Sequence, residues 1–464
     1  MELVSLIDFG STFTKIAIVD LDSEQMLARA QSVSTVAENM MDGLRKALSK
    51  LQMSKKAPGN IDVTKKLACS SAAGGLRILV AGLVPELTVE AARRAAFGAG
   101  AKVVASYSYE LNDDDMRKIE IEPCDLILLA GGIDGGNKDV ITHNAKLLAK
   151  TTLDIPIIVA GNRIVSSKVA EILRSSGKEV KVTENILPEL DKLNVDPARS
   201  LIREVFMERI VKAKGLDKAQ EYVGRILMPT PMATLRAARL LAEGTNGEEG
   251  LGELMVVEVG GATTNIHSIG MGRPTDSSVF FKGLPEPYDK RTVEGDLGIR
   301  YNAETILDTV GEDKVLRDIL NMDWNTLRRK ANFLANNIGF VPRNEEDFLV
   351  DAGLARSAVE VAVERHVGEI SEVPTLLGNV RIQHGKDLTA TKTVIGTGGI
   401  FSYGRYSKQI LEAVLFSERN PNLLKPMKAA LYVDKSYLLY GIGLLADTEP
   451  VKALRIAKKY LNRI

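Results

Sequence analysis

The sequence predicts an α/β protein of two similar domains that face one ligand, with a further α/β insertion in the first domain. The chain has 464 residues, which is too long for one ordinary hydrophobic core. A strand–turn–strand pattern near the N-terminus recurs in the second half of the chain. Between the two copies, short apolar strands alternate with helix-like stretches, which favours a parallel sheet.

The first copy is the stretch SLIDFGSTFTKIAIVD, Ser5–Asp20. Leu3–Ile7 and Ile16–Val19 are rich in branched apolar residues and flank a turn that contains Gly10, so they predict a β-hairpin. The tip of the hairpin offers backbone N–H groups and hydroxyls, and Asp8 ends the first strand. Donors with one carboxylate suit a phosphate and its metal ion, although plain connections have a similar composition.

The second copy is LMVVEVGGATTNIHSIG, Leu254–Gly270, which aligns with the first without a gap. Glu258 stands at the place of Asp8, and Gly260 at the place of Gly10. A chance match of two β-turns is the alternative interpretation. If the match reflects duplication, two phosphate-binding hairpins imply a di- or triphosphate in a cleft between the domains.

Three further segments are rich in glycine. TVIGTGGIF, Thr393–Phe401, is a strand that runs into a turn where missing Cβ atoms let a ring or ribose approach the backbone. AGGIDGGNK, Ala130–Lys138, lacks the Gly-Lys pair and the following hydroxyl of a P-loop, so we exclude a Walker-type site. CSSAAGGLR, Cys69–Arg77, precedes a helix-like segment; either its hydroxyls and Arg77 face the cleft or it is a structural turn.

Composition excludes several classes of function. Lys plus Arg and Asp plus Glu are 60 each, which favours neither nucleic acid nor an anionic membrane as a partner. Cys69 and Cys124 are too few for a disulfide framework or a zinc site, and the four histidines are scattered. No apolar run reaches the roughly 18 residues that a membrane span needs. We therefore expect a cytoplasmic protein, with a homodimer left open.

The order DFGSTFTK, EVGGATTN and GTGGIF resembles the phosphate-1, phosphate-2 and adenosine elements of the actin-like, or ribonuclease H-like, ATPase superfamily. PTPMATLRAARLLAEG and DKSYLLYGIGLL resemble the two connecting helices of that superfamily. The resemblance implies two actin-like ATPase domains around a nucleotide cleft. The implied boundaries are 1–243 for the first domain with an α/β insert at about 101–190, 250–440 for the second domain, and 441–464 for C-terminal helices that return to the first domain.

The phrases DFGSTFTK, ACSSAAGGLR, GGATTNIHS and RTVEGDLGIR resemble the glutamate mutase accessory proteins of the MutL or GlmL type, which share only a name with mismatch-repair MutL. This resemblance implies an ATP-using chaperone or reactivating factor whose partner is an adenosylcobalamin-dependent mutase, glutamate mutase or an aminomutase. The alternative is a small-molecule kinase of the same superfamily, with Asp134 and Asp296 as candidate bases. A filament-forming actin relative is a third class, which nothing in the sequence favours.

The resemblance also implies roles for individual residues. Asp8 and Glu258 would serve catalysis and hold Mg2+, while Lys15 is expected to point to solvent. The residues implied to cradle the phosphates of ATP are Gly10, Ser11, Thr12, Gly260, Gly261, Ala262 and Thr263, and those implied to flank the adenosine are Gly396, Gly398 and Gly399.

This chain departs from the superfamily pattern at three positions. Glu258 and Asn265 replace the usual aspartates of phosphate-2, and Met228 stands where DnaK-type chaperones carry a glutamate. Asn265 can neither carry charge nor accept a proton, and Mg2+ tolerates misplaced ligands poorly. We therefore expect slow or partner-dependent hydrolysis of ATP.

Three further features carry interpretations that the sequence alone does not decide between. Arg291, Glu294 and Asp296 are candidates for clamping a nucleotide or a partner, and solvated loop charges are the alternative. His267 is more typical of a core or edge position than of a catalyst. The strands CDLILLAGG, IPIIVAGN and EVKVTEN predict a parallel βαβαβ insert, which either docks a partner protein or decorates the core. The insert lacks Asp-x-His-x-x-Gly, so we do not interpret it as a cobalamin module.

Overall fold

A computed structural model describes residues 2–10, 12–35, 39–53, 63, 65–71, 76–210, 221–224, 226–318, 322–376 and 378–464. The chain divides into two compact units, which are described separately. Unit 1 comprises Met1–Ala72, Lys214–Phe281 and Tyr288–Ile464, and unit 2 comprises Ala73–Ala213 and Lys282–Pro287.

The first sheet of unit 1 has five strands in the order β10-β4-β1-β2-β3. β1 and β2 pair antiparallel, as do β2 and β3, whereas β4 runs parallel to β1 and to β10. All seven residues of β1 are buried, which explains its nearly continuous apolar sequence. The strands are β1 (Leu3–Phe9), β2 (Phe13–Asp20), β3 (Gln25–Val33), β4 (Lys65–Ser70) and β10 (Ile226–Pro229).

The second sheet of unit 1 repeats this plan in the order β16-β14-β13-β19-β20, with β21 added at its edge. β13 and β14 pair antiparallel as β1 and β2 do, and β19 and β20 follow in parallel. The shared topology confirms the duplication that the two hairpin sequences predicted. The strands are β13 (Leu254–Val259), β14 (Thr264–Ile269), β16 (Asp289–Glu294), β19 (Thr393–Thr397), β20 (Ala430–Asp434) and β21 (Leu461–Arg463).

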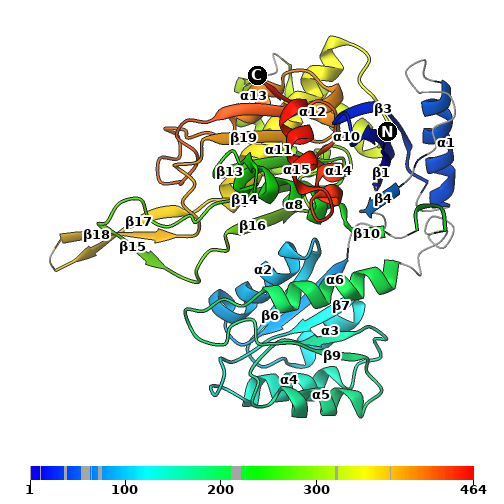
Figure 1. The fold of residues 1–464 in the computed structure, drawn as a ribbon. Helices are drawn as coiled ribbons and strands as arrows, with labels where there is room; N and C mark the ends of the chain where they lie inside the picture. The colour runs from blue at the N-terminus through cyan, green and yellow to red at the C-terminus, as the bar shows by residue number, and fades with distance from the viewer. Residues whose placement is uncertain are drawn as a thin grey trace. The chain divides into compact units, whose positions relative to one another are not determined.

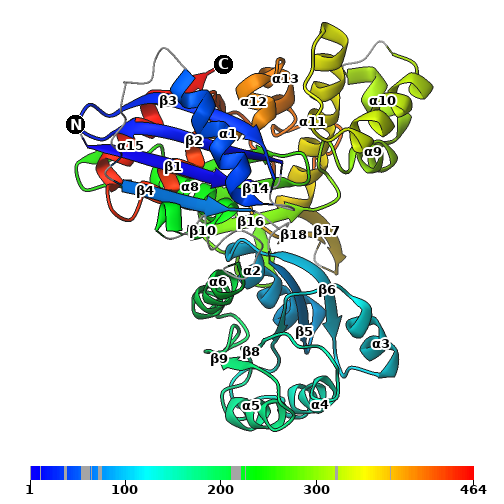
Figure 2. The same cartoon turned by 90° about the vertical axis from the view of Figure 1, so that its right-hand side faces the viewer.

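Helices cover these sheets. α1 packs on β2 and β3, and Figure 2 shows it across one face of the first sheet. α8 and α14 pack against each other within a core that also includes residues of β1, β4 and β13. A second core lies on the other face of the second sheet, and α9, α10, α11 and α13 contribute to it. The helices are α1 (Met40–Met53), α8 (Thr230–Glu243), α9 (Ala303–Asp318), α10 (Trp324–Asn336), α11 (Glu345–His366), α12 (Gly399–Tyr403), α13 (Ser407–Glu412), α14 (Leu439–Leu445) and α15 (Pro450–Tyr460).

Two small sheets complete unit 1. β11 (Gly244–Thr245) and β12 (Glu248–Glu249) form a short hairpin after α8. β15 (Val279–Lys282), β18 (Gly378–His384) and β17 (Glu369–Thr375) form a three-stranded sheet that projects as an arm in Figure 1. Among the described residues, no helix combines the length and apolar character that crossing a membrane requires.

Unit 2 is a five-stranded parallel sheet in the order β6-β5-β7-β8-β9, which is the strand order of flavodoxin. The parallel βαβ prediction for β7, β8 and β9 is confirmed. The elements are β5 (Arg77–Gly82), η2 (Pro85–Val89), α2 (Glu90–Gly98), β6 (Lys102–Ser108), α3 (Asp113–Ile121), β7 (Leu126–Leu129), α4 (Asp139–Leu148), β8 (Ile157–Val159), α5 (Ser166–Arg174), β9 (Val180–Val182) and α6 (Asp196–Ile210).

Unit 2 begins earlier than the insert expected at about 101–190, because β5 is an inner strand that pairs with both β6 and β7. The segment after Cys69 therefore leads into a strand and not into the expected helix. Arg77 pairs with Asp125 at 2.9 Å, so the structure uses its side chain within unit 2.

Unit 2 also holds a short strap, Lys282–Pro287, which begins at the last residue of β15 and ends before β16. Arg94 of α2 donates to the carbonyl oxygen of Pro285 at 2.7 Å and forms an ion pair with Glu286 at 2.7 Å. The Arg94 side chain is 11% exposed and that of Glu286 is 2% exposed, so this contact is largely shielded from water. The strap is therefore an integral part of unit 2 despite its distance along the chain.

Candidate functional site

The tips of the two predicted hairpins have the same closed turn. The Gly10 N–H donates to the Phe13 carbonyl oxygen at 3.2 Å, and the Gly260 N–H donates to the Thr263 carbonyl oxygen at 2.9 Å. Both glycine N–H groups are thus used inside the protein. Donors for a phosphate therefore have to come from the other residues of each turn. Ser11, one of the residues implied to cradle phosphate, lies outside the described residues.

The two tips face each other within unit 1. A Cβ atom on Gly261 would lie 3.2 Å from Oγ1 of Thr12, which belongs to the other hairpin. The second tip is held from behind, because the Gly261 carbonyl oxygen accepts from the Arg300 N–H at 2.9 Å. The Arg300 guanidinium in turn binds both oxygens of Asp351, at 2.9 and 2.6 Å. Arg300 therefore supports the tip structurally.

Asp8 lies at the end of β1 and is 1% exposed. Its Oδ2 forms an ion pair with Lys15 Nζ at 2.7 Å, and its Oδ1 accepts from the Thr230 hydroxyl at 2.6 Å. Lys15 Nζ also donates to the Tyr437 hydroxyl at 3.1 Å. The expectation that Lys15 points to solvent is wrong, because Asp8 and Lys15 are directly opposite in the hairpin and their side chains share one face.

Glu258 occupies the equivalent position in the second hairpin and is 8% exposed. Its cross-strand neighbour Asn265 donates to Glu258 Oε2 at 3.2 Å and accepts from the Arg291 guanidinium at 2.9 Å. His267 Nε2 lies 3.6 Å from the same Glu258 oxygen. Asn265 thus bridges an acid and a buried cation, a role that the sequence analysis did not find.

Nearby polar and cationic side chains compensate the negative charges of the buried Asp8 and Glu258. Burial by itself would raise the pKa of Glu258, but His267, Arg291 and Lys15 together hold that pKa below its ordinary value. Burial lowers the pKa of Arg291 to about 10, so the guanidinium stays charged at neutral pH. Burial would also lower the pKa of Lys15, but Asp8 and Tyr437 outweigh it and hold that pKa above the ordinary value. Both acids therefore have a cation nearby that a metal ion would have to displace or share.

The three charged residues proposed as a clamp separate into two groups. Arg291 joins the Asn265 and Glu258 cluster, whereas Glu294 and Asp296 bind Arg365 at 2.6 and 3.0 Å. Only Arg291 is therefore part of the cluster around the second hairpin. Its edge-strand pairing with β14, in which Arg291 is opposite His267, places it there.

The glycines implied to flank adenosine have different surroundings. A Cβ on Gly396 would lie 2.8 Å from the Phe401 ring, and Gly398, with φ of +111°, lies directly against the Val259 carbonyl oxygen. Both glycines are thus required by packing within the protein. A Cβ on Gly399 would meet nothing within 4 Å, so the backbone there is open to a ligand.

The two hairpins supply few ligands for a metal ion. In the described part of the chain no group of three or more His, Cys, Asp or Glu side chains could hold a metal ion. Asp8 and Glu258 supply one carboxylate from each hairpin, and Mg2+ is commonly held by one or two carboxylates, phosphates and water. The residues present fit a magnesium–nucleotide complex better than a free metal ion.

A second buried histidine lies on the other face of β14 and β16. His366, at the end of α11, contacts the Thr292 hydroxyl with Nδ1 at 2.9 Å and the Ser268 hydroxyl with Nε2 at 2.8 Å. Burial, with the charges of Lys290 and Lys386, lowers the pKa of His366 well below 6.5. The folded protein therefore keeps this ring neutral at pH values where an unfolded chain would protonate it.

We expect this histidine to make the protein sensitive to acid. Because its folded pKa is depressed, stability is fully present above the ordinary histidine pKa and is lost as the pH falls below it. Relative to His366→Gln, the wild type should lose about 1.4 kcal/mol of unfolding free energy per pH unit between roughly pH 6 and 5. Urea titrations of both proteins at a series of pH values measure this slope, and parallel pH curves would contradict it.

Two sheets of this order, each with an acid-bearing hairpin whose tip faces the other, define the actin-like ATPase class of fold. The chain belongs to the MutL protein family, the glutamate mutase accessory family, since the model of the MutL protein family matches residues 4–461. Protein MutL of Clostridium tetanomorphum is 47% identical over 466 residues, covering all of both chains. These matches confirm the resemblance that the sequence motifs indicated.

Solved structures give a looser likeness. A nucleotide-free acetone carboxylase is 14% identical, with 96% of this chain and 70% of that chain covered and a TM-score of 0.40. A glycerol dehydratase reactivase is 10% identical, with 96% and 99% covered and a TM-score of 0.35. A xylulose kinase from Lactobacillus acidophilus is 10% identical, with 100% and 93% covered and a TM-score of 0.35. The strand order of the two sheets defines the fold of this chain.

Proposed function

We propose that this protein binds Mg-ATP at the two facing hairpin tips and acts in the cytoplasm as an ATP-dependent chaperone or reactivating factor. Its partner is an adenosylcobalamin-dependent mutase, either glutamate mutase or an aminomutase. The observation that carries the proposal is the approach of Thr12 and Gly261, one from each copy of a duplicated hairpin. Facing turns of this kind offer backbone donors from two sides to a chain of phosphates. Membership of the MutL family supports the mutase as the partner.

In this proposal the ion pair between Asp8 and Lys15 opens when the nucleotide arrives. Asp8 would then be the residue of the first hairpin that holds the hydrated Mg2+, and the Lys15 ammonium would be free to pair with a phosphate oxygen. The magnesium ion supplies charge neutralisation for the phosphates. Gly399, at the open start of α12, would lie beside the adenosine.

The same geometry favours slow hydrolysis. Asn265 holds Glu258 with its amide and is itself held by Arg291, so neither residue is a free base for an attacking water. A change in the second hairpin that breaks this bridge would release Glu258. We propose that binding of the mutase supplies such a change and raises turnover.

The two candidate bases of the kinase alternative, Asp134 and Asp296, do not support that function. Asp296 is bound to Arg365, and Asp134 accepts from the Asn185 amide at 2.9 Å and from the Arg163 N–H at 2.9 Å. Each carboxylate is thus occupied in a structural contact.

Phosphate release from Mg-ATP tests the proposal directly. The purified protein should hydrolyse ATP slowly. If Asn265 and Arg291 restrain hydrolysis until a partner binds, addition of a cognate adenosylcobalamin mutase should raise the rate at least ~10-fold. A rate that the mutase does not change, together with mutase binding that ATP does not change, would contradict an ATP-driven accessory role. Phosphorylation of a metabolite would revive the kinase alternative.

Gly261→Val tests the position of the nucleotide. The added side chain fills the space between Gly261 and Thr12 and also meets Arg300, where a Cβ would lie 3.4 Å from the nearest carbon, so we expect an at least ~10-fold loss of Mg-ATP affinity by calorimetry, with urea unfolding of the same variant to measure any loss of stability separately. The matched control is Gly339→Ala, where a Cβ would meet nothing within 4 Å. Unchanged affinity in Gly261→Val would place the nucleotide elsewhere.

A further inference from the structure

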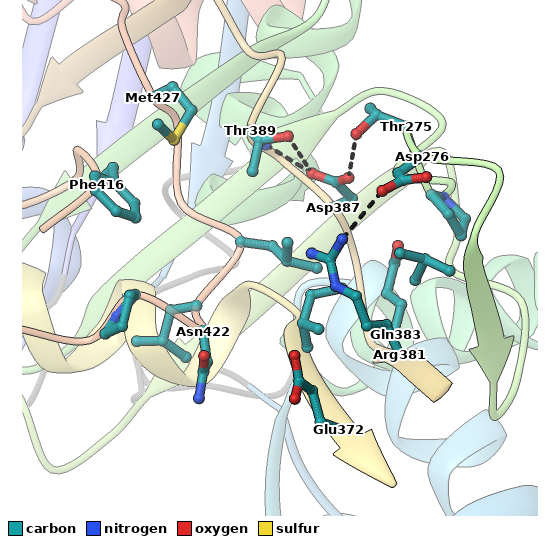
Figure 3. Close-up of a pocket in the computed structure, with 16 residues that line it drawn as sticks. Thr275, Asp276, Glu372, Arg381, Gln383, Asp387, Thr389, Phe416, Asn422 and Met427 are labelled. Atoms are coloured by element: carbon teal, nitrogen blue, oxygen red, sulfur yellow. Dashed lines mark hydrogen bonds and ion pairs between the residues drawn. The ribbon is translucent and has the colours of Figure 1, made fainter. Parts of the chain in front are cut away.

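A pocket of about 540 Å³ lies at the base of the arm, apart from the two hairpins. Its walls come from β15 and the loop before it, β17, β18 and the loop after it, and the segment between α13 and β20 (Figure 3). A volume of this size is typical of small-molecule sites and is ample for one long side chain.

Backbone hydrogen bonds hold the walls of the pocket in place. The Ile370 N–H donates to the Asn422 carbonyl oxygen at 2.9 Å, which ties β17 to the segment before β20. The Met427 N–H donates to the Thr389 carbonyl oxygen at 3.2 Å, which ties that segment to the loop after β18. The pocket is therefore formed before any ligand binds.

The polar side of the pocket carries excess negative charge. Asp276 is paired with Arg381 at 3.0 Å. Asp387, which is 8% exposed, accepts from the Thr389 N–H and hydroxyl at 2.9 and 2.6 Å, and Glu372 accepts from the Asn379 amide at 3.3 Å. Within the described residues neither Asp387 nor Glu372 forms an ion pair. Glu372 lies directly opposite Arg381 in the pairing of β17 with β18, so the pocket has three carboxylates and one guanidinium, which Asp276 already binds.

An uncharged acceptor lies beside them. Gln383 is fully buried and lines the pocket, next to Arg381 on the same face of β18 (Figure 3). Its amide nitrogen donates to the carbonyl oxygens of Gly272 and Gly385 at 3.0 and 2.9 Å, which fixes the orientation of the amide. Its Oε1 accepts no hydrogen bond in the described part of the chain. A buried acceptor without a donor favours a ligand that brings an N–H group.

The opposite side of the pocket is apolar. Phe416 and Met427 lie together across from Asp276 and Asp387 in Figure 3, and Ile370 also lines the cavity. Acid on one side and an apolar wall on the other fit a ligand with a cationic head on an aliphatic stem.

The arm also exposes apolar side chains outside the pocket, and two of them, Phe280 and Val373, follow the pocket-lining Val279 and Glu372 in their strands and so point to the other face of the sheet. On the arm, Phe280 is 65% exposed, and Phe281, Val373 and Leu376 are exposed as well. Large exposed apolar side chains on such an arm mark a contact surface for another macromolecule, which a small free amine would leave uncovered.

We propose that this pocket receives a lysine or arginine side chain of a partner polypeptide, whose neighbouring apolar residues cover the arm. The ammonium or guanidinium group is held by Asp387 and Glu372 and donates toward Gln383. The aliphatic stem packs on Phe416 and Met427. The site does not depend on nucleotide binding at the hairpins, so it can be tested separately from the proposed function.

The test compares two peptides that differ in one charge. The probes are acetyl-Leu-Lys-Leu-amide and the same peptide with norleucine at the centre, titrated into the full-length protein by calorimetry. We expect the lysine peptide to bind at least ~10-fold more tightly, and this advantage to shrink at 0.5 M salt because charge attraction is screened. The advantage should fall at least ~3-fold in Glu372→Gln and further in Asp387→Asn, since each removes one carboxylate.

Controls separate the possible outcomes. Glu312→Gln removes an exposed acid of α9 and should leave both affinities unchanged. Glu372 is exposed, so its variant should fold normally even if Asp387→Asn does not. Equal binding of the two peptides would overturn the proposal. Binding of n-butylammonium as tight as that of the lysine peptide would assign the site to a free amine and overturn the polypeptide as its occupant.

Discussion

Replacing Lys15 by methionine should lower the free energy of unfolding by about 3 kcal/mol, because it leaves the Asp8 carboxylate buried without its cation. Methionine has a similar length and an apolar stem, so the change removes charge with little change in volume. The Thr230 hydroxyl would be the one strong donor left to Asp8, at 2.6 Å. Urea unfolding of wild type and variant measures the difference.

The double variant Asp8→Asn with Lys15→Met is the control for this result. It removes both charges and keeps an acceptor for Thr230. Removal of a whole buried ion pair destabilises a protein far less than removal of one partner, so the double variant should recover at least half of the lost free energy of unfolding. If Lys15→Met unfolds at the same urea concentration as the wild type, Lys15 points to solvent in solution and the ion pair does not compensate Asp8.

The second large effect concerns the contact between the two connecting helices. Gly443 of α14 lies so close to the Ala233 carbonyl oxygen of α8 that an added Cβ has no room. Because the obstacle is backbone, which cannot rotate away, we expect Gly443→Ala to cost about 3 kcal/mol of unfolding free energy or more, at the upper end for overpacked sites. Thermal and urea unfolding measure the loss.

Gly399→Ala provides the matched control. The substitution is the same and the residue is also helical, but a Cβ at Gly399 meets nothing within 4 Å. Alanine is favoured over glycine in helices, so the variant should be as stable as the wild type or slightly more so. Equal effects of the two substitutions would mean that the helices can separate without loss, and that their close approach is unimportant for stability.

The parts of the site that the sequence predicted well are encoded locally. The order of acid, glycine and small residues between two apolar strands was enough to identify both hairpins and their duplication. The position of Lys15 could also have been predicted, since a short turn pairs Phe9 with Thr14 and so sets Lys15 opposite Asp8. The register of the hairpin, followed one residue pair beyond the turn, is enough to predict this contact.

Other features depend on pairing between distant segments. Arg291 reaches Asn265 only because β16 lies beside β14 in a particular register, and nothing in either strand specifies that register. The start of unit 2 was misjudged because RILVAG is short and apolar, and such a run does not distinguish a buried strand from a helix. The pocket beside the arm combines four chain segments, so no single motif indicates it.

The strap of unit 2 has a consequence for synthesis of the protein on the ribosome. Arg94 and most of unit 2 are made early, but Glu286 and the Pro285 carbonyl group follow only after Lys214–Phe281 have been translated. At about 5–20 residues per second, the nascent unit waits several seconds while Arg94 has Glu90 of its own helix as a partner but not yet Glu286 or the Pro285 carbonyl group. Completion of unit 2 is therefore coupled to emergence of the second hairpin, β13 and β14, from the ribosome.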